Sequence, residues 1–303
     1  MKFDNIKISV IVPTIGRQDV IKCLESISKQ SISCFEVILC YDGDDFFSFD
    51  KLIKSHRCDN FVKVINVGPF KGGNNARQSG IEISQGNYIA FLDDDDEWLP
   101  NHLETMISKI DDLTNEYNFV FSKPIRIQNN KRVKQSVTYS DQGLLKHICT
   151  YSKETKSLGS IQSSLILVGK AVLELVPLNR KLRFHQDTEW LLRLGQQNEI
   201  DLNVYFTDEH TVMTNDTIGS VSKNIKSSAS KELFVKTIKN KKFLGNCILW
   251  ISYGYAVVNE DFWSKLKIYS YAIFNTKPDM RIVAIATLKL FLPWQTIRKF
   301  LHK

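Results

Sequence analysis

Five carboxylates stand side by side at residues 93–97 (DDDDE), directly after the short apolar run at 87–92. Adjacent carboxylates repel one another, and a bound divalent cation offsets that repulsion because hard cations prefer oxygen ligands. Asp93 and Asp95 lie two positions apart, so in an extended chain their side chains point the same way and can share one cation. The alternative is a solvated acidic turn, with Pro100 starting the next helix.

Two further groups suit an anionic ligand. Gly72 and Gly73 precede a predicted helix at 74–84, where the backbone can approach a phosphate closely and free N–H groups can bind it. Arg77 lies in the first turn of that helix and suits a phosphate clamp. Another polar dipeptide, at residues 42–43 (DG), ends an apolar run. Taken singly, each of these groups is explained by a turn or a helix cap.

The elements that must position these residues alternate along the first hundred positions. Apolar, β-branched runs predict strands at 6–13, 35–41, 61–67 and 87–92, and amphipathic spacing predicts helices at 19–30 and 74–84. This alternation predicts an α/β fold with a mostly parallel sheet covered on both faces. Ligands of such sheets bind beyond the carboxyl ends of the strands, which is where the polar groups fall.

The pattern changes after residue 111. Further strands are predicted at 117–121, 132–139 and 163–168, a helix at 187–197, and helices from 230 onward. The polar stretch at 214–230 indicates a boundary near 220. We therefore expect one domain at 1–220 and a helical, basic C-terminal region at 221–303. Aromatic residues after 243 recur at helical spacing, and we predict that they form the core of that region.

The chain has 40 Lys and Arg against 33 Asp and Glu, and the excess lies late in the sequence. Residues 223–242 hold seven lysines and one acid, and residues 281–303 hold five basic residues and no acid. We expect residues 281–303 to contact anionic membranes peripherally, with Trp294 and Phe300 at the headgroups. The apolar face predicted for this contact consists of Ile282, Val283, Ile285, Ala286 and Leu290. A solvated basic face is the alternative, and no nucleic-acid recognition motif accompanies the charge.

Cysteine spacing and the terminal segments indicate in which cellular compartment the protein works. The six cysteines show no paired short spacing, so neither a zinc site nor a disulfide framework is indicated. The first residues lack the cleavage site of a signal peptide, and the apolar run at 282–288 is far shorter than the about 20 residues of a spanning helix. We expect a cytoplasmic protein, at most peripheral on the inner face of the cytoplasmic membrane.

Taken together in chain order, the motifs resemble those of the family-2 inverting glycosyltransferases of GT-A fold. The resemblance rests on residues 9–14 (SVIVPT), 42–43 (DG), 73–77 (GNNAR) and 86–96 (GNYIAFLDDDD). It covers about residues 6–100 closely and continues weakly to about 220. The chain departs from the family at Tyr41, where a further Asp is common, and at Asp44, where Ser is usual; these departures leave the nucleotide base open.

The resemblance implies a GT-A domain that binds a nucleotide-sugar donor and Mn²⁺ or Mg²⁺. It assigns the donor to five side chains: Thr14, Asp42, Arg77, Asp93 and Asp94. Within this set Thr14 and Asp42 would contact the base, and Asp93 the ribose. Asp95, together with Asp93, would ligate the metal as a DXD motif. A cation held there would act as a Lewis acid on the departing nucleoside diphosphate.

Inversion also needs a base that takes a proton from the acceptor hydroxyl. Asp187 stands at the first turn of the predicted helix at 187–197, on the same side as its apolar stripe, and is either a helix cap or a catalytic group. The family places its base just before such a helix, so the resemblance implies that Asp187 is the base, with Glu189 as the alternative. We interpret His185 as a structural neighbour and His210 as a surface residue, although some relatives complete the metal site with a histidine.

We therefore expect an enzyme that transfers a sugar, from a UDP-linked donor, to a lipid-linked or oligosaccharide acceptor during synthesis of an O-antigen, capsule or outer core. Direct displacement would give a β-linkage from an α-donor. A sugar-phosphate nucleotidyltransferase is one alternative, but it would need a glycine-rich loop where residues 13–17 (PTIGR) supply one glycine. A non-catalytic, membrane-surface binding protein of the same fold is the other, and the intact Asp93, Asp95 and Asp187 argue against it.

Overall fold

The computed structural model describes residues 5–56, 61–128, 131–139, 142–215 and 225–292. The chain divides into two compact units. The first, which we call the sheet unit, comprises Met1–Ser136, Ile161–Trp190 and Asn198–Ile218. The second, the helical unit, comprises Val137–Ser160, Leu191–Gln197 and Gly219–Lys303. The predicted domain boundary near 220 lies within 216–224, outside the described residues.

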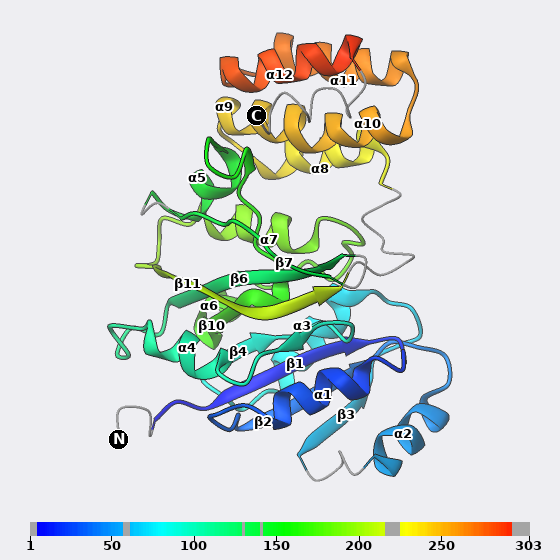
Figure 1. Ribbon diagram of the computed structural model, residues 1–303, viewed down its shortest axis with the longest axis vertical. Coiled ribbons are helices and arrows are strands. Elements are labelled where there is room, and N and C mark those ends of the chain that lie inside the picture. The colour runs from blue at the N-terminus through cyan, green and yellow to red at the C-terminus, as the bar shows by residue number, and fades with distance from the viewer. Residues whose placement is uncertain (1–4, 57–60, 129–130, 140–141, 216–224, 293–303) are drawn as a thin grey trace. The chain divides into compact units, whose positions relative to one another are not determined.

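The sheet unit is built on one nine-stranded sheet (Figure 1). Its strands are β1 (Ile8–Thr14), β2 (Glu36–Tyr41), β3 (Val62–Asn66), β4 (Tyr88–Phe91), β5 (Glu97–Trp98), β6 (Asn118–Gln128), β7 (Lys131–Lys134), β10 (Ile166–Gly169) and β11 (Asn203–Asn215). They pair in the order β3-β2-β1-β4-β10-β6-β11-β5, with β7 beside β6.

The first four strands are parallel, as the sequence predicts. Val10 of β1 pairs with Val37 of β2 on one side and with Ala90 of β4 on the other. Strand β11 also runs parallel to β6, whereas β10, β5 and β7 join their neighbours antiparallel. The expected α/β class is therefore confirmed, with antiparallel strands added to the parallel part of the sheet.

Helices pack along this sheet. They are α1 (Val20–Ser28), α2 (Phe46–Ser55), α3 (Gly73–Ile83), α4 (His102–Ser108), the 3₁₀ turn η1 (Ser163–Leu165), α6 (Lys170–Leu175) and α7 (Gln186–Leu194), whose last turn belongs to the helical unit. Helix α3 lies directly against β1 and β2. A Cβ atom at Gly80 would lie 2.7 Å from the Cys40 sulfur and 2.8 Å from Ile11 Cγ2, so the close approach of α3 requires glycine.

The helical unit contains α5 (Leu144–Cys149), the short hairpin β8 (Tyr151–Ser152) and β9 (Ser157–Leu158), α8 (Ser227–Thr237), α9 (Lys241–Cys247), the π-helix η3 (Ile248–Ser252), α10 (Tyr253–Asn259), α11 (Phe262–Asn275) and α12 (Met280–Phe291). In Figure 1, α11 and α12 form a layer over α8, α9 and α10. None of the helices within the described ranges is long and apolar enough to cross a membrane.

Burial corrects two predictions for the helical unit. Tyr253 lies in its core as predicted, but Trp263 and Phe274 are 67% and 83% exposed, so not all of its aromatic residues are core. Conversely, Ile282, Ile285 and Ala286, predicted to face a membrane, are buried. Helical spacing defines two faces of a helix, and here the aliphatic face is the inner one. Trp294 and Phe300 lie outside the described residues.

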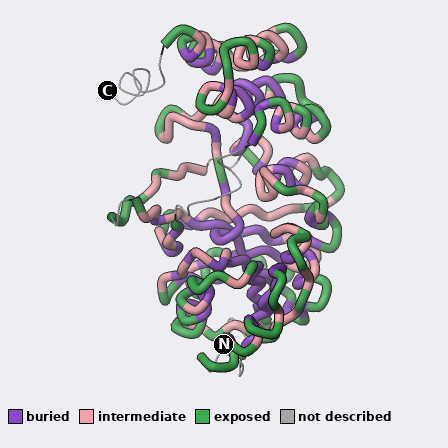
Figure 2. The backbone as a smooth tube through the Cα atoms, turned by 90° about the vertical axis from the view of Figure 1, so that its right-hand side faces the viewer, coloured by how far each residue is buried: buried purple, intermediate pink, exposed green. Residues whose placement is uncertain are grey.

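The core of the sheet unit runs along its central strands (Figure 2). Every residue of β1 is buried, and so are all four residues of β4. Such continuous apolar runs are typical of strands covered on both faces. The central strands are thus rigidly packed, and the polar residues that follow them start from fixed positions.

One titratable residue belongs to this core. His102 at the start of α4 stacks on Trp98, with ring centroids 4.5 Å apart, and its Nδ1 lies 2.8 Å from Thr211 Oγ1 of β11. Its Nε2 is buried and has no hydrogen-bond partner among the described residues. Burial lowers the pKa of His102 from 6.5 to about 3, so the folded protein holds this ring neutral.

We predict that His102 makes the sheet unit sensitive to acid. The unfolded chain takes up a proton at His102 below pH 6.5, whereas the folded protein does so only near pH 3, so stability is complete above 6.5 and is lost as the pH falls toward 3. The loss reaches about 1.4 kcal/mol per pH unit in the free energy of unfolding. Denaturant titrations of wild type and His102→Phe at several pH values measure it. A constant difference between the two proteins from pH 7 to pH 4 would contradict the prediction.

Candidate functional site

The carboxyl ends of three neighbouring strands meet at one edge of the sheet. Strand β1 ends at Thr14, and its parallel neighbours β2 and β4 lead directly into Asp42 and into the acidic turn at 92–96. Thr14 Oγ1 donates a hydrogen bond to Asp94 Oδ2 at 2.6 Å, and the Asp42 N–H donates to the Thr14 carbonyl at 2.7 Å. The sequence prediction that these segments lie together is correct.

Exposure alternates along the acidic turn. The side chains of Asp93 and Asp95 are 33% and 15% exposed, whereas Asp94 and Asp96 are buried. The two buried carboxylates are held by hydroxyl groups of the protein: Thr14 binds Asp94, and Ser164 Oγ donates to Asp96 Oδ2 at 2.6 Å. The partly exposed pair, Asp93 and Asp95, is therefore the pair that a ligand can reach.

Two residues that the sequence analysis did not single out fix this turn from other elements. Arg17, after β1, lies 3.2 Å from both Asp94 Oδ1 and Asp95 Oδ2. Asn215, at the end of β11, donates from its backbone N–H to Asp96 Oδ1 and from its amide to the Asp95 carbonyl. Arg17 offsets part of the repulsion between the carboxylates. Its position just past a strand end is the signal that would have identified it.

Asp42 holds the loop that leads into α3. Its two carboxylate oxygens accept hydrogen bonds from the backbone N–H groups of Lys71, at 2.7 Å, and Gly72, at 2.6 Å. Gly72 has φ of +101°, a conformation that favours glycine. The predicted base-contacting residue thus fixes the loop before α3, and each of its oxygens still has lone pairs for a further donor.

Arg77 connects the acidic turn with the segment before α7. Its Nη2 donates to Asp93 Oδ1 at 2.5 Å and to Ser163 Oγ at 3.1 Å, and its Nη1 donates to Gln186 Oε1 at 3.1 Å. A Cβ atom at Gly73 would lie 3.0 Å from that same Gln186 oxygen. Gly73 therefore leaves room for the contact between Arg77 and Gln186. The planar guanidinium of Arg77 thus reaches three segments at once.

Asp187 joins the same network through Ser163. The Ser163 backbone N–H donates to Asp187 Oδ2 at 3.2 Å, and the Ser163 hydroxyl lies 3.3 Å from Asp93 Oδ1. Burial raises the pKa of Asp187 and Asp93 raises it further, while Arg77 opposes both effects. A carboxyl whose pKa is raised toward neutrality is a stronger base than an exposed one.

The cluster carries more negative than positive charge. Burial raises the pKa of Asp94 to about 6, against the lowering effects of Thr14 and Arg17. Burial and the neighbouring Asp93 raise that of Asp96 as well. For Arg77, burial alone would lower the pKa, but Asp93 and Asp187 raise it by more, so the guanidinium stays charged. A further cation would relieve the remaining repulsion.

The donor set fits a divalent cation that shares its ligands with a substrate. Within the described ranges no group of three His, Cys, Asp or Glu side chains is placed to hold a metal by itself. Mg²⁺ is commonly bound by one or two carboxylates together with phosphate oxygens and water. Asp93 and Asp95 provide those two carboxylates, and a cavity of about 270 Å³ opens beside Asp95.

The remaining candidates lie around α7 and in β11. Glu189 is buried one turn into α7. His185 has φ of +52°, and burial lowers its pKa to about 4, which keeps the ring neutral. His210 is part of β11, and its Nε2 lies 3.0 Å from the carbonyl oxygen of Gln135. That contact ties β11 to the residue that follows β7, and His210 is partly buried.

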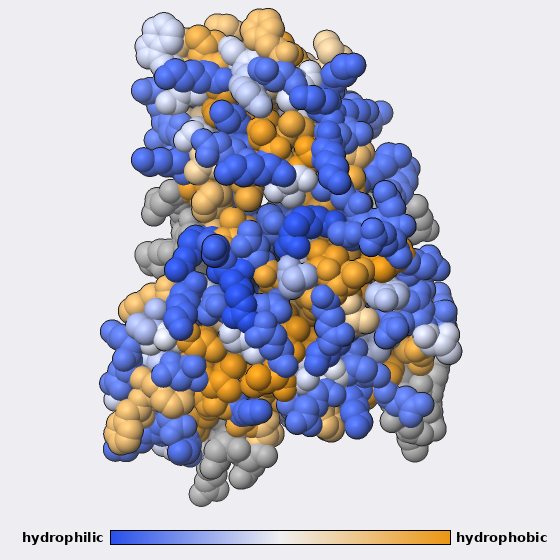
Figure 3. Space-filling view, turned by 180° about the vertical axis from the view of Figure 1, so that it is seen from behind, coloured by the Kyte–Doolittle hydropathy of each residue, from blue (hydrophilic) through white to orange (hydrophobic). Residues whose placement is uncertain are grey.

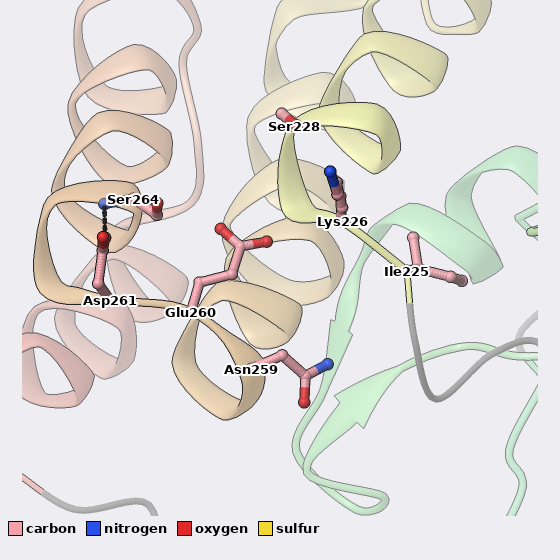
Figure 4. Close-up of a pocket in the computed structure, with 7 residues that line it drawn as sticks. All are labelled: Ile225, Lys226, Ser228, Asn259, Glu260, Asp261 and Ser264. Atoms are coloured by element: carbon pink, nitrogen blue, oxygen red, sulfur yellow. Dashed lines mark hydrogen bonds between the residues drawn. The ribbon is translucent and has the colours of Figure 1, made fainter.

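A second hollow, of about 590 Å³, lies in the helical unit (Figure 4). Its carboxylates already have partners: Glu260 accepts from the N–H and hydroxyl of Ser227 at the start of α8, and Asp261 accepts from the Ser264 N–H at the start of α11. These acids stabilise two helix N-termini. The hollow is therefore explained by helix capping, and the chemistry of the sheet edge is not repeated there.

Known proteins are similar to this chain in sequence and in fold. The glucosyltransferase WfgD of Escherichia coli, named for action on α-D-GlcNAc-diphosphoundecaprenol, is 29% identical over 143 residues, 45% of this chain and 55% of that protein. A Campylobacter jejuni β-1,3-glucosyltransferase, named for a GalNAc(5)-diNAcBac-PP-undecaprenol acceptor, is 27% identical over 188 residues, 61% of this chain and 59% of that protein. The chain thus spans somewhat over half the length of these relatives.

Among solved structures, residues 1–349 of S. aureus TarS, crystallised with UDP-GlcNAc, superpose with a TM-score of 0.62 at 15% identity. The superposition covers 97% of this chain and 90% of that one, and it confirms the expected GT-A fold. A profile of the family described as "Glycosyl transferase family 2" matches residues 9–165, which include all of β1 except Ile8, the acidic turn and Ser163. The chain therefore belongs to glycosyl transferase family 2.

Proposed function

We propose that the protein transfers a sugar from a UDP-linked donor to a lipid-linked acceptor, with inversion, during synthesis of a surface polysaccharide. The observation that carries the proposal is the network through Arg77 and Ser163. It links Asp93, on the donor side, with Asp187, the candidate base, at one edge of the sheet. A sugar held between these carboxylates would have its leaving group on one side and the acceptor hydroxyl on the other.

The names of the relatives support the acceptor class. Two of them act on sugars carried by undecaprenol diphosphate, and a third is named for amylovoran biosynthesis in Erwinia amylovora. A lipid carrier lies in a membrane, so we further propose that the protein works at the inner face of the cytoplasmic membrane. The complex of TarS with UDP-GlcNAc supports a UDP-linked donor for this fold.

The donor would bind over the carboxyl edge of the sheet. Thr14 and Asp42 would contact the base, Arg77 would lie near the base or the diphosphate, and Asp93 would contact the ribose. Asp93 and Asp95 would hold Mn²⁺ or Mg²⁺, which when bound offsets the charge of the departing diphosphate. Asp94 accepts a hydrogen bond from Thr14, and it would contribute to donor binding indirectly, by orienting Thr14.

Asp187 would take the proton of the acceptor hydroxyl. Its position is fixed by the Ser163 N–H, and Arg77 keeps a positive charge nearby. The hydroxyl oxygen then attacks the anomeric carbon from the face opposite the diphosphate, which inverts the configuration. Glu189, buried in the same helix, is the alternative base.

Removing Asp95 should abolish metal-dependent donor binding while the protein stays folded. We predict that Asp95→Ala loses the Mn²⁺-dependent rise in melting temperature that UDP produces, because one of two accessible carboxylates is gone. In wild type, UDP at a hundred times its Kd adds about 2.7 kcal/mol of stability. The matched control is Asp111→Ala, since Asp111 is an exposed carboxylate outside the acidic turn and its cavity. Unchanged Mn²⁺-dependent binding by Asp95→Ala would exclude the metal role.

Changing Asp187 should affect turnover and leave donor binding intact. We predict that Asp187→Asn lowers kcat about 10²- to 10⁴-fold, the usual contribution of a general base, with UDP and Mn²⁺ binding unchanged. The fold should persist, because an amide oxygen can still accept from the Ser163 N–H. Single-turnover rates of Asp187→Asn and Glu189→Gln, compared with wild type, measure the effect. Near-normal turnover of Asp187→Asn with a large loss in Glu189→Gln would identify Glu189 as the base instead.

A further inference from the structure

The positive charge of the chain resides in the helical unit. Residues 225–292 contain eleven Lys and Arg side chains and four Asp and Glu side chains, a difference that equals the net charge of +7 of the whole chain. Most of these residues belong to α8–α12 and their connections. Such a basic unit is attracted to a negatively charged surface over distances of about a Debye length, near 8 Å at physiological salt.

Helix α11 presents aromatic rings to solvent on one stripe. Trp263, Lys267 and Phe274 follow one another at intervals of four and seven residues, so they fall on the same side of the helix. Trp263 is 67% exposed and Phe274 is 83% exposed. The buried residues Ile268 and Ala272 lie on the opposite side. The outer stripe therefore has no role in the packing of the described core.

Helix α12 repeats this arrangement. Leu288 and Phe291 are exposed on its outer side, with Phe291 at 76%, while Ile282 and Ile285 form the buried side. Both α11 and α12 pack against η3 and α10, so their outer stripes face away from the same inner layer. Exposed Lys277 lies in the connection between the two helices. Figure 3 shows orange and blue side chains interleaved at this end of the helical unit.

Large exposed apolar residues grouped on one face mark an interaction surface. The charge on the stripe indicates which class of partner binds it. The stripe combines aromatic rings with lysines, which is the composition of helices that lie in a lipid–water interface. The α11 and α12 helices, of 14 and 12 residues, are too short to span a bilayer but suit a position along its surface. Trp in particular favours the headgroup level, where its ring is both apolar and able to donate a hydrogen bond.

We propose that the outer faces of α11 and α12 dock the protein onto an anionic lipid bilayer. Trp263, Phe274 and Phe291 enter the headgroup region, and Lys267 and Lys277 face the lipid phosphates. The proposal rests on the proposed function in one respect, because a lipid-linked acceptor is met at a bilayer; the docking surface itself is defined by the described residues. It differs from the membrane face predicted by sequence, because Ile282, Ile285 and Ala286 of that face are buried.

Vesicle binding of the full chain tests the surface. We expect wild type to float with vesicles of phosphatidylglycerol and phosphatidylcholine, to bind phosphatidylcholine alone far less, and to dissociate as salt is raised. The double variant Trp263→Ser, Phe274→Ser should lower the partition coefficient onto the anionic vesicles at least about tenfold. Each substitution removes an aromatic ring that would otherwise be buried in the headgroup region. The matched control is Phe47→Ser, because Phe47 is an 80% exposed aromatic residue of α2 in the sheet unit.

A charge variant tests the electrostatic part separately. Lys267→Glu should lower binding to the anionic vesicles at least about fivefold, whereas Lys51→Glu in α2 should leave it unchanged. Equal binding to neutral and anionic vesicles, or wild-type binding by the double serine variant, would overturn the proposal. So would a dimer that dissociates on Trp263→Ser without any vesicle binding, which would identify the face as a contact between copies of the chain.

Donor binding distinguishes this proposal from the proposed function. The surface variants should keep the Mn²⁺-dependent thermal shift with UDP, because their substitutions lie in the helical unit. Lost vesicle binding with an intact donor shift supports the docking surface alone. Intact vesicle binding in a wild-type protein that does not bind UDP would leave the docking surface standing and remove the proposed function.

Discussion

The arrangement of the sheet edge depends on how Arg77 balances the surrounding carboxylates. Asp93, Asp94, Asp95, Asp96 and Asp187 gather in a small, partly buried volume, where charges interact far more strongly than in water. Arg77 binds Asp93 directly and acts on Asp187 across Ser163, while Arg17 binds the next two carboxylates of the turn. The planar guanidinium can satisfy several oxygens at fixed angles, which an ammonium group cannot do. Removing this balance would leave like charges buried together.

The glycines before α3 make that balance possible. Gly72 adopts a conformation that other residues avoid, and Gly73 leaves space for Gln186 next to Arg77. Asp42 fixes the same loop through two backbone N–H groups. The segments that close the site are thus tied to the sheet by short hydrogen bonds from backbone and side chain. The arrangement of side chains at the sheet edge therefore depends on the loop before α3 as much as on the charged residues.

Much of the sheet unit could be predicted from sequence, because its signals are local. The strands at β1, β2, β3 and β4 are continuous apolar runs, and the rule for carboxyl ends placed Thr14, Asp42 and Asp93 together. Among the elements that escaped this reasoning are α2 and β11. Helix α2 carries apolar residues at helical spacing, with Phe49 and Ile53 buried, so its signal was present and was overlooked. Strand β11 carries a polar run in its middle (residues 207–210) that conceals a strand.

The parts of the site that escaped prediction depend on contacts between distant segments. Ser163 and Ser164 form an unremarkable pair in the sequence, yet the turn η1 brings them onto carboxylates about 70 positions earlier. Helical spacing likewise shows that α11 has two faces but does not tell which one is inside. That depends on the neighbouring helices, and the aliphatic face packs more closely against them than the aromatic face does.

The chain passes between the two compact units five times, since Val137–Ser160 and Leu191–Gln197 belong to the helical unit although sheet-unit segments flank them. Within that unit, Cys247 lies 3.5 Å from Cys149, and Asn246 donates to the Cys149 carbonyl. No single cut of the chain can therefore release either unit whole. A fragment that ends near residue 220 would keep α5 and the β8–β9 hairpin while losing the helices that cover them. Truncation near residue 220 is consequently a poor route to a minimal catalytic fragment. In a chimera, both units should come from the same parent protein.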